Sequence, residues 1–248
     1  MSVADAIKVE DETKGLRRFQ AGALFGLAGG VAGLVLPASV LLLAYFDSSG
    51  AIAFNATVVG LTSLLVLLGT LLLAISLIYY RFAFGSLRRW DRWFLLATIL
   101  CNIGSVGFFL ILAAVAVALP STPSLVQCIQ GSPTRTLTCL QAIQPLTAYS
   151  VVIGFWLAWI GGVGIILGLE LAGRRYQDHR LVIGGAVYAL LLLVLIAPFD
   201  ALLFPLGGWQ YPLLTVPLLA LIAPAYVFAG SYRSVRNGVP VRVDARAP

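Results

Sequence analysis

Residues 93 to 119 read WFLLATILCNIGSVGFFLILAAVAVAL and contain no charged side chain. Arg92 precedes this run and Pro120 follows it. About 30 Å of hydrocarbon is spanned by roughly 20 apolar helical residues, so the run is long enough to cross a bilayer. Lipid cannot hydrogen-bond to an open backbone, which leaves a helix as the structure of this segment. Residues 93–119 therefore predict a membrane-spanning helix.

The composition of the whole chain agrees with this prediction. Of its 248 residues, 60% are apolar and 10% are charged, whereas a soluble domain has about 25% charged residues. This balance excludes a secreted globular domain, a disordered chain and a cytosolic enzyme. Apolar runs of sufficient length cover about residues 20–46, 53–80, 93–119, 146–171, 181–204 and 211–229. The predicted fold class is all-α, a polytopic membrane protein with six transmembrane helices.

These runs also define the expected domain organisation. Residues 1–19 are expected to form a cytoplasmic N-terminal tail, with a short interfacial helix as one interpretation. Residues 20–230 are expected to form the six-helix domain, with an external loop at 120–145. Residues 231–248 are expected to form a basic cytoplasmic tail.

Cationic side chains predict the orientation of the bundle, because they favour the cytoplasmic side. Fifteen of the sixteen lie in four segments that fall on one side of a six-span chain: the two tails and the loops around 81–92 and 174–180. The exception is Arg135, in the opposite loop. We therefore expect both termini in the cytoplasm and contact with anionic lipid headgroups. The net charge of +6 is explained without a nucleic-acid partner.

The expected external loop contains Cys128 and Cys139, separated by ten residues. Thiols in an exported loop tend to oxidise, and closing this loop would contribute roughly 2–3 kcal/mol. We predict a disulfide between them. Free thiols and a metal pair are the alternatives, although the loop has no His, Asp or Glu to complete a metal site. Cys101, inside the third run, is expected to be a small buried apolar residue.

The sequence excludes several chemistries. The single histidine, His179, lies in an expected cytoplasmic loop, so neither bis-histidine haem ligation nor a Ser–His pair can form within the membrane. No lysine lies in an apolar run, and the phosphate-binding Gly-x-x-x-x-Gly-Lys-Ser/Thr pattern is absent. We expect no cofactor and no metal.

Two carboxylates approach the apolar runs, where ionisable groups are functional candidates. Glu170 lies four residues before Arg174, a spacing that favours a local ion pair; the alternative is a carboxylate that couples proton or substrate movement. Asp200 lies between Pro198 and Pro205. These prolines would break the fifth helix, as at transporter sites; the alternative is a hydrated helix end.

Glycines recur in the first and fourth runs at spacings that let helices approach closely. The candidate packing positions are Gly22, Gly26, Gly30, Gly161, Gly164 and Gly168. Aligning Gly22 with Gly154 also matches Gly29-Gly30-Val31 with Gly161-Gly162-Val163. Because each half would contain three spans, a true repeat would be inverted; the alternative is a coincidental match between two glycine-rich helices.

Two segments carry a resemblance to a known family. One is Gly15-Leu16-Arg17-Arg18 leading into Gly22-Ala23-Leu24, and the other runs from Arg81 to Arg92. They resemble a family of uncharacterised archaeal multi-span membrane proteins, a domain of unknown function, in which Gly85 and Asp91 match recurrent positions. The resemblance lies in the N-terminal half. It implies an archaeal plasma membrane and no activity, cofactor or site residue.

Three functions are compatible with these features. The first is a non-catalytic scaffold or accessory subunit, whose partners would be other membrane subunits or a second copy of the chain. The second is a small-molecule or ion transporter or channel that uses Asp200 and the inverted repeat. The third is a lipid-acting enzyme that uses Glu170, Asp178, His179 and Arg180, for which a solvated turn is the alternative reading.

Overall fold

The computed structural model describes residues 3–40, 56–88, 91–118, 120, 124, 136–196 and 210–236. Within these residues every regular element is a helix, which confirms the all-α fold class. Five of the helices are long and apolar enough to cross a membrane, and a further apolar helix is shorter. The five are α1 (Val3–Gly30), α3 (Ala56–Leu87), α4 (Trp93–Ala118), α7 (Pro145–Tyr176) and α9 (Gln210–Arg236), and the shorter one is α8 (His179–Ile196). We refer to these six together as the long helices.

Two smaller elements complete the described fold. A π-helix, η1 (Val31–Val35), continues α1, and an α-helical segment follows it to residue 40. The short helix α6 (Thr136–Ile143) precedes α7 in the segment that was expected to be an external loop. A π-helix inside an α-helix is an uncommon irregularity that needs local support from its neighbours.

The N-terminal segment differs from the expected tail, because α1 is helical from Val3 and has no break at residue 19. One face of α1 presents Glu12, Leu16, Phe19 and Ala23, which are 2% exposed or less. Their spacing of three or four residues keeps them on one side of a helix. Packing of this face joins the expected tail and the first apolar run into one element.

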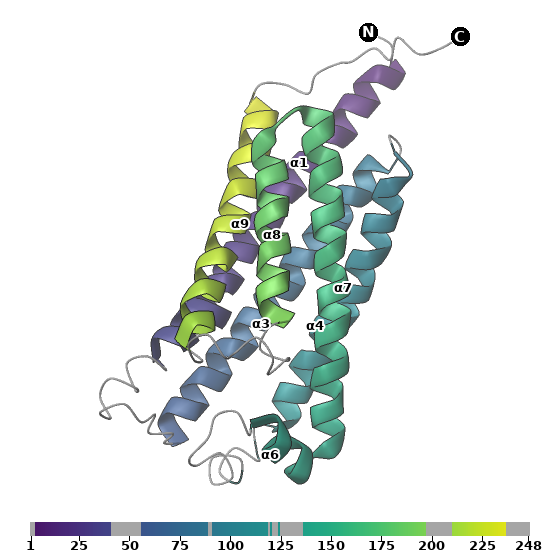
Figure 1. Ribbon diagram of the computed structural model, residues 1–248. Coiled ribbons are helices and arrows are strands. Elements are labelled where there is room, and N and C mark those ends of the chain that lie inside the picture. The colour runs from purple at the N-terminus through teal and green to yellow at the C-terminus, as the bar shows by residue number, and fades with distance from the viewer. Residues whose placement is uncertain are drawn as a thin grey trace.

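The six long helices follow one another around a ring in chain order (Figure 1). Each packs against its neighbours in sequence, and α9 closes the ring against α1. Successive helices run in opposite directions, so the N-terminal end of α1 and the C-terminal end of α9 lie at the same end of the bundle. Contacts between α3 and α7 reach across the ring.

This ring contradicts the predicted inverted repeat. A twofold axis in the membrane plane would reverse the sense in which helices follow one another, whereas here both halves continue around the ring in the same sense. The aligned glycines also face different neighbours. Gly29 faces Leu73 of α3, the next long helix, whereas Gly161 faces Gly104 of α4, the preceding one. The matched glycines therefore reflect a shared packing chemistry and not a repeated fold.

Small residues set the closeness of α4 and α7. A Cβ atom placed on Gly161 would lie 2.6 Å from the Cα of Gly104, and one on Gly154 would lie 2.8 Å from the carbonyl oxygen of Gly107. A Cβ on Gly164 would lie 2.7 Å from the Cβ of Leu100. Distances of this kind leave no room for a side chain, so the two backbones touch directly.

The other predicted glycines also lie at helix contacts. A Cβ on Gly22 would lie 3.3 Å from the carbonyl oxygen of Ser76 in α3, and one on Gly30 would lie 3.0 Å from that of Ala220 in α9. Gly26 faces both of these helices, and Gly168 faces the ring of Phe84. Each of these glycines therefore occupies a helix–helix contact.

Candidate functional site at the basic end of the bundle

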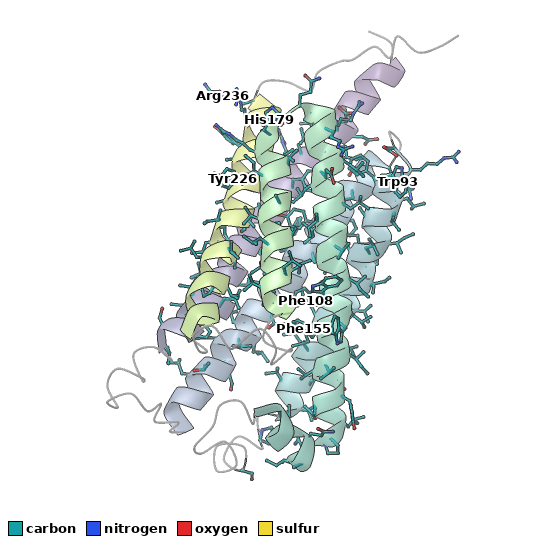
Figure 2. All side chains as sticks on the ribbon, viewed as in Figure 1. Trp93, Phe108, Phe155, His179, Tyr226 and Arg236 are labelled. Carbon is teal, nitrogen blue, oxygen red and sulfur yellow. The ribbon has the colours of Figure 1, made fainter. Side chains whose placement is uncertain are left out.

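Charged side chains gather at one end of the bundle, which we call the basic end. It includes the α3–α4 and α7–α8 turns and the C-terminal end of α9, and Figure 2 labels His179, Arg236 and Trp93 there. The arginines at this end are Arg17, Arg18, Arg81, Arg88, Arg92, Arg174, Arg175, Arg180, Arg233 and Arg236. Helix α4, by contrast, contains no charged residue over its whole length. The arrangement matches the clustering predicted from the sequence.

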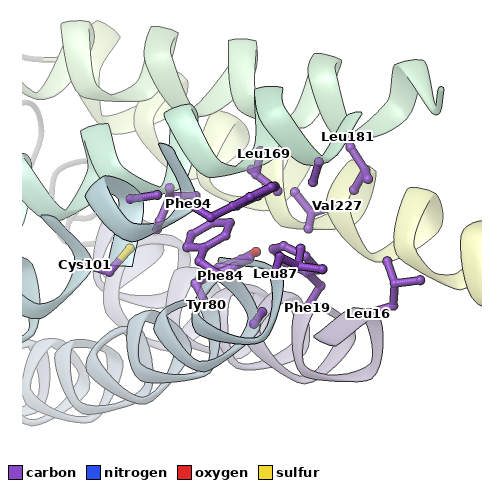
Figure 3. Close-up of a cluster of buried hydrophobic side chains, with 14 of the residues drawn as sticks. Leu16, Phe19, Tyr80, Phe84, Leu87, Phe94, Cys101, Leu169, Leu181 and Val227 are labelled. Atoms are coloured by element: carbon purple, nitrogen blue, oxygen red, sulfur yellow. The ribbon is translucent and has the colours of Figure 1, made fainter. Parts of the chain in front are cut away.

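A hydrophobic cluster fills the bundle just below the basic end (Figure 3). Phe19 of α1, Phe84 of α3 and Phe94 of α4 are 1% exposed or less. The rings of Phe19 and Phe84 meet edge to face, with centroids 5.3 Å apart, a favoured geometry for aromatic pairs. Leu169, Leu181 and Val227 bring α7, α8 and α9 into the same cluster. The cluster therefore ties together all six long helices.

One ion pair enters this packed region. Arg175 Nη2 donates a hydrogen bond to Glu12 Oε1 at 3.0 Å. This contact joins α7 to α1, although the two residues are 163 positions apart in the sequence. The side chain of Glu12 is 2% exposed and that of Arg175 is 24% exposed. Removing a carboxylate from water is costly, and a well-placed cation offsets that cost. The pair therefore couples the position of α1 to that of α7.

Sequence reasoning missed Glu12 because it lies in a segment of mixed charge that reads as a tail. The available signal was the spacing of Glu12, Leu16 and Phe19, which puts a carboxylate in line with two large apolar residues. Such a stripe is typical of a buried helix face. Its partner, Arg175, is far away in sequence, and nothing in the local pattern identifies it.

The predicted carboxylate Glu170 forms an ion pair with Arg174, one helical turn away. The side chains of Glu170 and Arg174 are 46% and 74% exposed, so the pair is solvated. Asp200 and Cys128 lie outside the described residues. The same holds for the side chain of Cys139, although its backbone lies in α6. Glu170 therefore lies at the basic end, in a local ion pair with Arg174.

The turn between α7 and α8 uses its polar groups for helix capping. Gln177 adopts a left-handed conformation with φ of 53°, and it ends α7. Asp178 Oδ1 accepts a hydrogen bond from the backbone N–H of Arg180 at 2.9 Å, which caps the start of α8. His179 and Arg180 are exposed. Asp91 caps α4 in the same way, through the N–H of Trp93 at 2.9 Å.

Deeper in the bundle, polar side chains bond mainly to backbone oxygens. Ser76 donates to the carbonyl of Gly22 at 2.6 Å and so bridges α3 and α1. Cys101 is fully buried, and its thiol lies 3.9 Å from the carbonyl oxygen of Gly161. Tyr80 is fully buried, and its ring meets that of Tyr188 edge on at 6.5 Å. These contacts are typical of interhelical packing.

Comparison with known proteins extends the resemblance noted in the sequence. No curated protein and no solved structure shows a significant match to the chain. A family described as protein of unknown function (DUF973) matches residues 12–240. The match reaches well beyond the N-terminal half, and it confirms the expectation of an uncharacterised family. It begins at Glu12, so it includes both partners of the ion pair between α1 and α7. Because the match covers most of the sequence, the chain belongs to the DUF973 family.

Proposed function

We propose that this protein is a non-catalytic integral membrane protein that serves as a scaffold or accessory subunit of a larger membrane assembly. The observation that carries the proposal is the confinement of charge, among the described residues, to the basic end of the bundle. Between Arg18 and the end of the described part of α1 there is no ionisable Asp, Glu, Lys, Arg or His, and the same holds for α9 before Arg233. The interior of the bundle is instead filled by glycine contacts and by the hydrophobic cluster below the basic end.

This interior supports a structural role for two physical reasons. A transport path for ions or polar solutes needs charged or hydrogen-bonding groups along its length. A close-packed bundle resists the rearrangements that alternating access requires. The proposed location is the plasma membrane, with both termini in the cytoplasm and the basic end against anionic headgroups. The proposed partners are other membrane subunits or a second copy of the chain.

Affinity purification of the tagged protein from its native membranes in a mild detergent tests the scaffold role. We expect a defined set of partner subunits in fixed stoichiometry. An untagged strain gives the background, and an unrelated tagged multi-span protein from the same membranes controls for nonspecific association. Recovery of the protein as a monomer, with no partner above this background, would contradict the scaffold proposal.

A transporter is a second candidate, and one observation favours it. The π-helix η1 packs against α9, which contains Pro217 and Pro224. Pro224 has no N–H, so the carbonyl of Ala220 cannot receive the usual helical hydrogen bond, and Gly30 lies against that carbonyl. Two irregular helices in contact resemble the broken helices of transporter sites.

Flux measurements in reconstituted vesicles distinguish the two candidates. The scaffold role predicts that wild-type protein supports no saturable flux of protons, sodium or small anions. If a saturable flux exists and Asp200→Asn abolishes it, the transporter takes the place of the scaffold. Glu170→Gln is the matched control, because it removes a carboxylate that is already paired and solvated at the basic end.

A further inference from the structure

Two guanidinium groups from different helices converge on one exposed aromatic ring at the basic end. The Cζ atom of Arg18 in α1 lies 5.8 Å from the ring centroid of Phe82 in α3, and that of Arg81 lies 5.3 Å from it. Phe82 is 47% exposed. Cations within about 6 Å of a ring centroid are attracted by the ring quadrupole. Phe82 thus holds two positive charges near one surface point.

Arg18 is held in place by further contacts. Its Nη1 donates to the hydroxyl of Ser86 at 2.8 Å and to the carbonyl oxygen of Phe82 at 3.3 Å. Gly15, on the same helix, lies against this part of α3, since a Cβ there would be in ordinary contact with the Cβ of Ser86 at 3.5 Å. These bonds use one terminal nitrogen of a group with five N–H donors. The other donors of Arg18 remain available to an acceptor from outside the protein.

The charges of Arg18 and Arg81 also differ from those of Arg174 and Arg175 in α7. Arg174 pairs with Glu170 and Arg175 pairs with Glu12. Within the part of the chain that the structure describes, no carboxylate pairs with Arg18 or Arg81. Like charges near one ring repel each other, and an anion that contacts both would lower that repulsion. Among the described residues, these two positive charges therefore have no carboxylate partner.

The surroundings select the kind of anion. Guanidinium groups bind phosphate oxygens through paired hydrogen bonds. Phe82 is 47% exposed and supplies apolar surface of the type found at headgroup level. A phosphate that carries acyl chains satisfies the arginines and this aromatic ring together. A soluble phosphate would satisfy the arginines alone.

We propose that Arg18, Arg81 and Phe82 form a binding site for the phosphate of an anionic phospholipid in the cytoplasmic leaflet. The site rests on the membrane insertion and orientation of the proposed function, and it does not depend on partner subunits. The site gives a common role to Arg18, from the first segment of the family resemblance, and to Arg81, which begins the second. Arg18 and Arg81 bind the phosphate, and Phe82 positions both guanidinium groups.

The test uses the purified full-length protein in detergent, without partners. Phosphatidylglycerol, phosphatidylcholine and inorganic phosphate are titrated separately, and binding is followed by native mass spectrometry and thermal unfolding. The variants are Arg18→Gln and Arg81→Gln. Arg236→Gln is the matched control, since it removes the same charge from an exposed position at the same end.

Phosphatidylglycerol is expected to bind wild-type protein and Arg236→Gln more tightly than phosphatidylcholine does. Each of the other variants should weaken phosphatidylglycerol binding by about tenfold, as expected for the loss of one charge-assisted hydrogen bond. Arg81→Gln leaves the hydrogen bond between Arg18 and Ser86 in place. Its binding measurement therefore still tests the site if the Arg18→Gln protein fails to fold. Equal phosphatidylglycerol affinity of Arg81→Gln and Arg236→Gln would overturn the site. Stabilisation by inorganic phosphate as strong as that by phosphatidylglycerol would overturn the lipid as its ligand. Neither result depends on whether partner subunits exist.

Discussion

Glu12 is almost completely removed from solvent in the fold, and Arg175 is the cation that compensates its charge. Loss of the interaction between them leaves the buried carboxylate or its packed surroundings without a contact that offsets desolvation. Breaking this pair should cost more stability than breaking Glu10–Lys14 or Glu170–Arg174. Each of those two pairs is exposed to solvent and lies within a single helix. Pairs of that exposed kind contribute little to stability.

Glu12→Ala is therefore expected to lower the free energy of unfolding. Loss of one partner of a buried pair costs about 3–5 kcal/mol, and the partial exposure of Arg175 favours the lower end of that range. Thermal unfolding in detergent measures the change, and a double-mutant cycle with Arg175→Ala isolates the coupling. Glu10→Gln is the control on the same helix and should leave stability unchanged. Equal stability of Glu12→Ala and Glu10→Gln would contradict a buried pair.

The disulfide between Cys128 and Cys139 remains a prediction from the sequence. Both residues lie in the expected external loop, whereas Cys101 is buried in α4. Mass spectrometry of non-reduced peptides from freshly isolated membranes should recover the 128–139 link, with Cys101 alkylated only after unfolding. Free thiols at both loop positions would refute the link and the external placement on which it rests.

At the scale of elements, the α4–α7 contact depends on the absence of side chains at the crossing point. Gly161 and Gly104 bring two backbones together. Gly85 in α3 is also helical, but a Cβ there would meet no atom within 4 Å. Gly161 is tightly packed, whereas Gly85 has open space around it. At both positions glycine lowers helix stability relative to alanine, because it loses more conformational entropy on folding.

The substitutions Gly161→Ala and Gly85→Ala should therefore change stability in opposite directions. At Gly161 the new methyl group would lie 2.6 Å from the Cα of Gly104, and forced separation of packed elements costs about 1–3 kcal/mol. At Gly85 the helix gains alanine without a clash, which stabilises by about 0.4–1 kcal/mol. Thermal unfolding of both variants in one detergent provides the comparison. Stabilisation by Gly161→Ala would mean that α4 and α7 are not in direct backbone contact.

At the scale of the whole molecule, six long helices in a ring place the four basic segments at one end. Positive charge favours the cytoplasmic side of a membrane. Cysteine labelling on intact cells tests the orientation, in a background without the native cysteines. A membrane-impermeant maleimide should label Gln130→Cys and leave Ser2→Cys unlabelled until the cells are opened. Labelling of both positions from outside would contradict the six-span topology.

The sequence alone determined the helical class, the segments that form the long apolar helices and the clustering of arginines. These properties follow from hydropathy and charge, which are read along the chain without knowledge of neighbours. The run at 93–119 agrees closely with α4, because Asp91 and Pro120 bound it locally. Membership of an uncharacterised family also followed from short segments of sequence.

The tertiary structure alone decided which helix faces touch. It turned the expected tail into the first part of α1, because the burial of Glu12 and Phe19 depends on α3 and α7. It also removed the inverted repeat, because the sense of the ring depends on all six helices together. Linear patterns specify which groups favour lipid or water, whereas ion pairs, glycine contacts and ring order arise between segments far apart in the chain.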